Sequence, residues 1–107
     1  MKRPSGAELI AAERQRQIAD EGWTASHDDN HHDEGELAIA AACYALPHDE
    51  RMRTIWEERL VTLLWPWDWC RWKPAPKKTI KHRIRELTKA GALIAAEIDR
   101  LQRAQHA

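Results

Sequence analysis

The apolar residues of this chain recur with the period of an α-helix, and no segment alternates with the period of two that a strand requires. Ser5 and Glu8 have the spacing of a capping box, as do Asp33 and Glu36, and Thr79 precedes the longest apolar repeat. The pattern predicts helices over residues 6–20, 34–46, 49–64 and 80–104. We therefore expect an all-α fold, a small antiparallel four-helix domain that occupies residues 1–107.

The last predicted helix carries an apolar seam whose residues follow one another in steps of four and three, the heptad pattern of coiled coils. The seam consists of Ile80, Ile84, Leu87, Gly91, Ile94, Ile98 and Leu101. The glycine would let another helix approach closely, and Lys89 lies beside the seam. Because a core built from 107 residues is small, we expect a homo-oligomer in which this seam forms all or part of the interface.

Two segments break the helical pattern. Residues 25–32 follow a Gly-Trp-Thr break and are predicted to form a loop. Residues 65–78 contain three prolines and four tryptophans, which predicts an irregular Trp/Pro-rich loop before the long C-terminal helix. Five of the seven aromatic residues lie between Trp56 and Trp72, so aromatic side chains are concentrated in this part of the chain.

Charge is balanced overall but unevenly distributed. The 17 Lys and Arg equal the 17 Asp and Glu, a neutral total that argues against a general nucleic-acid binder. Residues 20–36 nevertheless hold seven acidic side chains and no Lys or Arg, whereas residues 65–89 hold eight basic and two acidic ones. No apolar run approaches the roughly 20 residues of a membrane span, and the two cysteines suggest neither a disulfide framework nor a four-cysteine zinc site. We expect a cytoplasmic protein that does not bind membranes.

Residues 27–34 contain seven side chains able to bind metals or carry protons: three histidines and four carboxylates. Three interpretations remain open. The segment is a solvated acidic loop that caps the next helix, or Asp28, Asp29 and Glu36 accept hydrogen bonds from the ribose of a nucleotide, or the imidazoles and carboxylates bind zinc, manganese or iron. Since side chains adjacent in sequence cannot all converge on one ion, we predict neither a metal nor a cofactor.

The Trp/Pro-rich loop is the second candidate for ligand binding. Tryptophan offers a flat surface for base stacking, and neighbouring Arg and Lys hold phosphates. Trp69 and Trp72 stand among charges and suit a ligand or partner, whereas Trp67 can also simply cover a core that lacks Phe. Trp23 is likewise a candidate core anchor. The candidate ligand-binding residues are Arg14, Gln17, Trp23, His27, Asp28, Asp29, His32, Glu36, Trp67, Trp69, Arg71, Trp72, Lys73 and Lys89.

No enzyme motif is present: the sequence has no glycine-rich phosphate loop, no GxSxG and no HExxH. A helical nucleotide pyrophosphohydrolase would need paired carboxylates on two helices to hold Mg²⁺. Glu57 and Glu58, or Glu97 and Asp99, do not have that spacing on one helical face. We therefore predict no catalytic residues.

The order of the motifs resembles a small protein family found in tailed phages and prophages, over nearly the whole chain. The resemblance rests on Glu13–Gln17 (ERQRQ), Glu21–Thr24 (EGWT), His27–Asp29 (HDD), Gly35–Leu37 (GEL), Trp65–Trp67 (WPW), Lys89–Ile94 (KAGALI) and Ala96–Ile98 (AEI). It implies a phage setting, with the cytoplasm of the host cell as the location, and no particular activity.

About 30 residues are also similar to the ryanodine-receptor-type repeat domain. Gly22–Thr24, Asp28–Asp29, His32 and Leu46–Pro47 echo its motifs, although His27 replaces the arginine before the two aspartates. Bacterial relatives of that repeat imply the sensing of nucleotide ligands.

These features together predict a protein that binds a nucleotide-derived small molecule. In a phage setting it would sequester a host immune signal, such as a cyclic oligonucleotide or a cyclic ADP-ribose. The alternatives are a metal-dependent nucleotide hydrolase and a protein-interaction inhibitor that uses the tryptophans as a hot spot.

Overall fold

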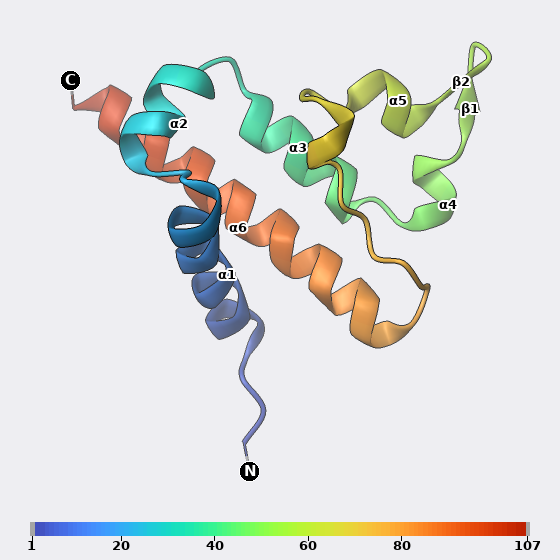
Figure 1. The fold of residues 1–107 in the computed structure, drawn as a ribbon, viewed down its shortest axis with the longest axis horizontal. Helices are drawn as coiled ribbons and strands as arrows, with labels where there is room; N and C mark the ends of the chain where they lie inside the picture. The colour runs from blue at the N-terminus through green and yellow to red at the C-terminus, as the bar shows by residue number, and fades with distance from the viewer. Residues whose placement is uncertain (1, 107) are drawn as a thin grey trace.

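The computed structural model describes residues 2–106, which are predominantly helical as predicted (Figure 1). Within that range the structure contains six α-helices, one 3₁₀ turn and one two-stranded hairpin. The helices are α1 (Gly6–Glu21), α2 (Ala25–His31), α3 (Glu36–Ala45), α4 (His48–Arg51), α5 (Leu60–Leu64) and α6 (Ile80–Gln105). The hairpin consists of β1 (Thr54–Ile55) and β2 (Glu58–Arg59), and the 3₁₀ turn is η1 (Trp69–Arg71).

The long helix α6 organises the fold: α3 packs along it and shares the hydrophobic core with it, while α1 crosses it (Figure 1). Alanines dominate this contact, with Ala40 and Ala41 on α3 facing Ala90 and Ala96 on α6. Small side chains let the two helices approach closely, and Leu93 fills the remaining space. The arm that runs through residues 65–78 then covers the core with Trp65, while Trp67 and Trp72 are partly buried against it.

Two helices begin where the sequence predicts. The Oγ of Ser5 accepts from the amide of Glu8 at 3.1 Å, and the Glu8 carboxylate accepts from the amide of Ser5 at 3.0 Å. This capping box starts α1, which ends at Gly22 with a φ of 69°. The hydroxyl of Thr79 caps α6 in the same manner, by accepting from the amide of His82.

Residues 25–31 form the helix α2, so the loop predicted there is wrong. Thr24 is the N-cap and accepts from the amide of His27, and Asp28 anchors the helix by its buried contacts. The predicted cap of the next helix is also wrong. Gly35, with a φ of 85°, is the N-cap of α3, and the Glu36 carboxylate instead accepts from the amide of Glu34 at 2.6 Å.

The helix predicted over residues 49–64 is wrong as well. It divides into α4, the hairpin and α5, because Trp56 and Glu57 adopt positive φ angles of 51° and 72° and reverse the chain. Two central residues with positive φ suit the right-handed twist of a hairpin. Its tip projects from the body, and Trp56 is 92% exposed.

The large aliphatic side chains of the α6 seam lie on an exposed outer face of this helix, on both sides of the point where α1 crosses it. These six side chains are between 45% and 82% exposed. At the centre of the seam, a Cβ on Gly91 would lie 2.4 Å from Cδ1 of Ile10, so the close helix approach predicted at this glycine is made by α1 of the same chain. Among residues 2–106 no helix is both long and apolar enough to cross a membrane.

Candidate functional site

A pocket of about 240 Å³ opens between α1, α3, the arm and α6. We call it the charged pocket, because seven of its twelve lining residues carry charge. It is lined by Glu13, Arg16, Gln17, Glu21, Trp23, Tyr44, Trp65, Arg71, Lys73, Arg85, Lys89 and Leu93. Five cations face two carboxylates, so the pocket has an excess of positive charge.

Glu13 positions two of these cations. It is 3% exposed, and its carboxylate accepts two hydrogen bonds from Arg16 at 2.9 Å and one from Arg85 at 2.6 Å. Burial acts to raise the pKa of Glu13, but the hydrogen bonds from the two guanidinium groups outweigh burial and hold that pKa below its usual range. Glu13 is therefore a carboxylate at neutral pH that fixes an arginine from α1 beside one from α6.

Two buried polar atoms at the charged pocket lack hydrogen-bond partners within residues 2–106: the Oε1 of Gln17 and the indole Nε1 of Trp23. Gln17 is 2% exposed and Trp23 is 6% exposed, and the Nε2 of Gln17 lies 3.4 Å from Glu13. Leaving a buried donor or acceptor unpaired costs about 1–3 kcal/mol. A ligand that supplied a donor to Gln17 and an acceptor to Trp23 would remove that penalty.

The aromatic wall of the charged pocket holds the arm against α3. The hydroxyl of Tyr44 accepts from the amide of Lys73 at 3.0 Å, and its ring packs edge-on against Trp65. The ammonium of Lys89 lies 5.4 Å from the centre of the Tyr44 ring. Burial, with the positive charge of Arg85, lowers the pKa of Lys89, so an anion in the pocket would relieve the unfavourable surroundings of this cation.

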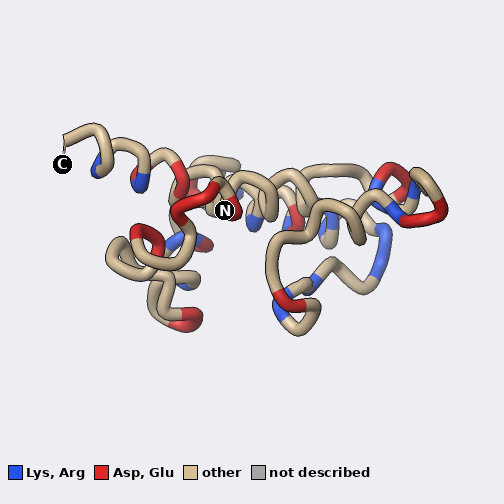
Figure 2. The backbone as a smooth tube through the Cα atoms, turned by 90° about the horizontal axis from the view of Figure 1, so that it is seen from above, with Lys and Arg blue, Asp and Glu red and all other residues tan. Residues whose placement is uncertain are grey.

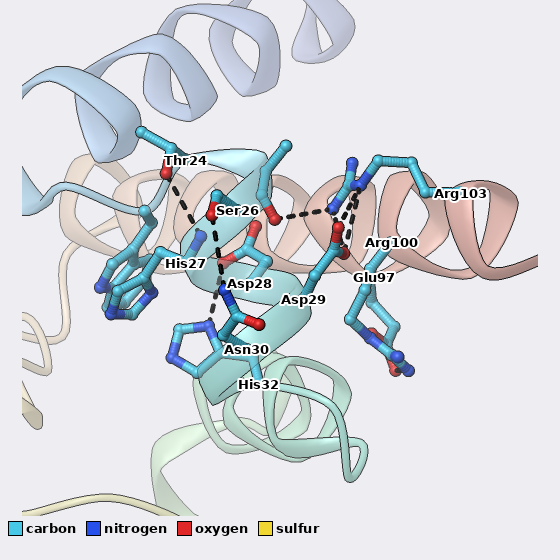
Figure 3. A network of polar contacts seen from close by, with 12 residues as sticks. Thr24, Ser26, His27, Asp28, Asp29, Asn30, His32, Glu97, Arg100 and Arg103 are labelled. Carbon is cyan, nitrogen blue, oxygen red and sulfur yellow. Dashed lines mark hydrogen bonds and ion pairs between the residues drawn. The ribbon is translucent and has the colours of Figure 1, made fainter. Parts of the chain in front are cut away.

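The predicted residues of the segment 27–32 lie on α2 or, for His32, at its C-cap, and their side chains make different contacts (Figure 3). Asp28 is fully buried, accepts from Arg14 at 2.8 Å and lies 2.9 Å from the Nδ1 of His32. Asp29 points the other way, toward the end of α6, where Arg103 donates to its carboxylate at 2.8 Å. Asp28 is thus part of the internal structure, while Asp29 is a surface ion pair.

The arm and the segment 27–32 lie together in the fold, although about 40 residues separate them in the sequence. Trp67 packs on His32 with ring centres 4.8 Å apart and on Trp23 at 5.3 Å. Trp72 packs on Tyr44 and Trp65, each at 4.8 Å, with Arg51 over its ring. These contacts leave Trp67 and Trp72 partly buried against the core.

Five of the predicted ligand-binding residues line the charged pocket: Gln17, Trp23, Arg71, Lys73 and Lys89. Trp69 is 50% exposed and borders a different hollow, with Trp72. The remaining predicted residues outside the charged pocket are Arg14, His27, Asp28, Asp29, His32, Glu36 and Trp67. Sequence reasoning missed Glu13, Arg16, Glu21, Tyr44, Trp65 and Arg85 as pocket residues. The sequence does contain one signal for them: Glu13 is four residues from Gln17, and Arg85 is four residues from Lys89, so each pair shares one face of its helix.

Comparison with known protein families, with curated protein sequences and with solved structures finds no match for this chain.

Proposed function

We propose that the charged pocket binds a phosphate-bearing, nucleotide-derived small molecule and holds it without cleaving it. The observation that supports this most is the pair of unpartnered buried atoms, on Gln17 and Trp23, in a pocket that five cations line. Buried polar atoms in folded proteins are usually hydrogen-bonded, so an unpaired amide oxygen and an unpaired indole N–H at a pocket favour a ligand that pairs with them.

Each part of such a ligand has a complementary group. Arg16, Arg85 and Lys89 hold the phosphate, because Glu13 already fixes the two guanidinium groups in position. The base lies on the aromatic wall and donates an amino hydrogen to Gln17. Glu21 accepts from ribose hydroxyls at the pocket edge.

The size of the charged pocket favours one nucleotide unit in each chain. Pockets for drug-sized ligands enclose about 300–1,000 Å³, and this one encloses about 240 Å³. A cyclic oligonucleotide of the kind that a host immune system uses would therefore extend beyond a single pocket. Two chains would each bind one of its nucleotide units.

The arrangement supports binding rather than metal-dependent hydrolysis. Both oxygens of Glu13 accept hydrogen bonds from arginines, and a carboxylate engaged in this way is not a favourable ligand for the Mg²⁺ that phosphoryl transfer requires.

The experiment is a thermal-shift screen, followed by calorimetry, of AMP, ADP, ADP-ribose and cyclic dinucleotides, with adenosine and pyrophosphate as partial ligands. We expect a phosphate-bearing nucleotide to raise Tm and adenosine to do so less, with intact ligand recovered after the protein is denatured. Gln17→Leu should weaken binding, while Arg103→Met, outside the charged pocket, should not. Equal binding to wild type and Gln17→Leu, or recovery of a cleaved product, would contradict the proposal.

We further propose that the protein acts as a homodimer built on the outer face of α6. The chain exposes 7403 Å², whereas a compact monomer of 12.4 kDa is expected to expose about 6,100 Å². The excess exceeds the roughly 800 Å² that each partner buries in a standard interface. The molecule is also flat, with extents of 44 × 42 × 22 Å (Figure 2).

A further inference from the structure

Three imidazoles gather along α2 and at its C-cap, and one of them packs against Trp23. His27 lies one helical turn before His31, and their ring centres are 4.8 Å apart. His32 follows directly, with its ring 4.8 Å from that of His27. The ring of His27 therefore lies within reach of both other imidazoles.

A buried carboxylate completes the group. Asp28 has no exposed surface, and its Oδ1 lies 2.9 Å from the Nδ1 of His32. One ligand atom from each of His27, Asp28 and His32 can be chosen so that all three lie within 4.8 Å of one another. Tetrahedral zinc ligands at about 2.0–2.2 Å from the ion lie about 3.3–3.6 Å apart, so side-chain rotations that draw these atoms together by about 1 Å would place them around one ion.

One atom of this group is left unsatisfied by the protein. The Nδ1 of His27 is buried and has no hydrogen-bond partner within residues 2–106. An imidazole nitrogen without a hydrogen-bond partner is available as a metal ligand.

We propose that His27, Asp28 and His32 bind a divalent transition-metal ion of the zinc class. The ion would take the place of the proton that the Asp28 carboxylate and the His32 imidazole share. The other oxygen of Asp28 keeps its 2.8 Å hydrogen bond from Arg14, and this bond orients the carboxylate as outer contacts do in known metal sites. His31 is the nearest further imidazole.

The donor set selects among metals. Two imidazoles with one carboxylate suit zinc and its neighbours, whereas Mg²⁺ prefers oxygen ligands and retains its waters. The charges around the site also matter, because Arg14 pairs with Asp28 at 2.8 Å and offsets part of the charge of that carboxylate. The two imidazoles are therefore essential to affinity.

The ion would fix the side chains of α2 at the place where this helix meets the arm. His32 packs against Trp67 and, edge-on, against Trp23, which also lines the charged pocket. Binding to the folded chain alone stabilises it by mass action. This inference does not depend on the nucleotide proposal, since none of the three ligands lines the charged pocket.

The test uses the full chain, freed of metal with a chelator and titrated with Zn²⁺, Co²⁺, Ni²⁺ or Mg²⁺ in a calorimeter. We expect one Zn²⁺ per chain and an increase in Tm, with no response to Mg²⁺. Co²⁺ should show the visible absorption of a four-coordinate ion, and Ni²⁺ should quench tryptophan fluorescence because two indoles contact His32. An unresponsive wild type, or an equal response to Mg²⁺, would overturn the proposal.

Variants locate the site. His27→Gln should weaken Zn²⁺ binding by more than about tenfold, because even outer contacts of metal sites contribute about 10–100-fold. This histidine is only partly buried, so the variant should fold; His32→Gln tests the buried ligand in parallel. His48→Gln, an exposed histidine on α4, is the matched control and should bind like wild type. Zn²⁺ binding that survives His27→Gln unchanged, or that is lost in His48→Gln, would show that the ion binds elsewhere.

Discussion

The ammonium of Lys89 donates a hydrogen bond to the backbone oxygen of Lys73 at 2.9 Å. Because Lys89 belongs to α6 and Lys73 to the arm, this bond fastens the arm across the aromatic wall of the charged pocket. The lowered pKa of Lys89 shows that its positive charge is disfavoured there, first by burial and then by Arg85. A cation whose charge is disfavoured in this way would be stabilised by an anion bound beside it.

Lys89→Met should therefore weaken binding of a phosphate-bearing nucleotide by about tenfold or more, since a hydrogen bond to a charged group contributes about 1.5–3 kcal/mol. Binding of the wild type should also weaken as the pH rises toward the ordinary lysine value of 10.5, because Lys89 loses its proton earlier than an exposed lysine does. Calorimetry across pH, on wild type and variant, measures both effects.

The control for this prediction is Lys78→Met. Lys78 is exposed and pairs with Asp49 outside the charged pocket. Its removal should leave both the affinity and the pH profile unchanged. If Lys78→Met and Lys89→Met reduce affinity equally, general electrostatic attraction would explain the binding and the specific role of Lys89 would be wrong.

Local signals in the sequence predicted much of the fold. The capping box at Ser5 and the cap at Thr79 act over three residues, so the sequence reveals both helix starts. The helix α2 was missed because its stability depends on Asp28, whose partner Arg14 lies on another helix. The hairpin at Trp56 was missed because helical apolar spacing continues through it, while the positive φ angles that reverse the chain leave no such pattern.

The candidate site could be predicted only in part. Residue type identified Lys73, Lys89 and Arg71 as phosphate-binding candidates, and all three line the charged pocket. The path of the arm over α3 and α6 decides which tryptophans pack on the core and which line a pocket. Sequence spacing does not determine that path. The pocket role of Glu13 likewise depends on Arg85, 72 residues away.

A second prediction concerns the buried ion pair of Glu86. Its carboxylate accepts from Arg51 at 2.8 Å and from the amide of Ala75 at 3.1 Å, and the side chains of the pair are only 4% and 6% exposed. Glu86→Gln leaves the charge of Arg51 buried without a counterion. We expect a loss of about 3–5 kcal/mol in the free energy of unfolding, measured with urea.

The pH dependence follows from the same contacts. Burial acts to raise the pKa of Glu86, but the hydrogen bonds from Arg51, Ala75 and Arg83 outweigh burial and lower it. The stability that Glu86 contributes is therefore complete above its ordinary value of 4.5 and is lost as the pH falls from there through the lower folded-state pKa. Glu86→Gln should lose less stability over that window. Glu50→Gln, at an exposed pair with Arg53, should change stability by less than about 0.5 kcal/mol.

A third prediction tests the contact between Gly91 and Ile10. A Cβ on Gly91 would lie 2.4 Å and 2.7 Å from two side-chain carbons of Ile10, so Gly91→Ala overpacks the crossing of α1 over α6. Overpacking costs about 1–3 kcal/mol, against a helix-propensity gain of about 1 kcal/mol for alanine.

A double-mutant cycle that combines Gly91→Ala with Ile10→Ala predicts whether the change at Gly91 stabilises or destabilises the protein in each background. In an Ile10→Ala background the space is open, and the same Gly91→Ala change should then stabilise the protein because only the propensity gain remains. Urea denaturation of the four proteins measures the difference. If Gly91→Ala has the same effect in both backgrounds, α1 does not pack on Gly91 as described.

The last prediction concerns the outer face of α6. If two chains associate through it, Ile98→Glu should convert the dimer to a monomer, because a buried carboxylate without a partner is strongly disfavoured. Ile98 is 51% exposed in the single chain, so the helix itself should tolerate the change. Leu63→Glu is the matched control: it is 52% exposed but lies on α5, away from the seam. Analytical ultracentrifugation at micromolar concentration should give a dimer for wild type and Leu63→Glu and a monomer for Ile98→Glu, with equal helix content by circular dichroism.

A monomeric wild type would contradict the dimer itself. A dimeric Ile98→Glu would instead show that the interface lies elsewhere, so that the dimer would not account for the exposed aliphatic side chains of the α6 seam.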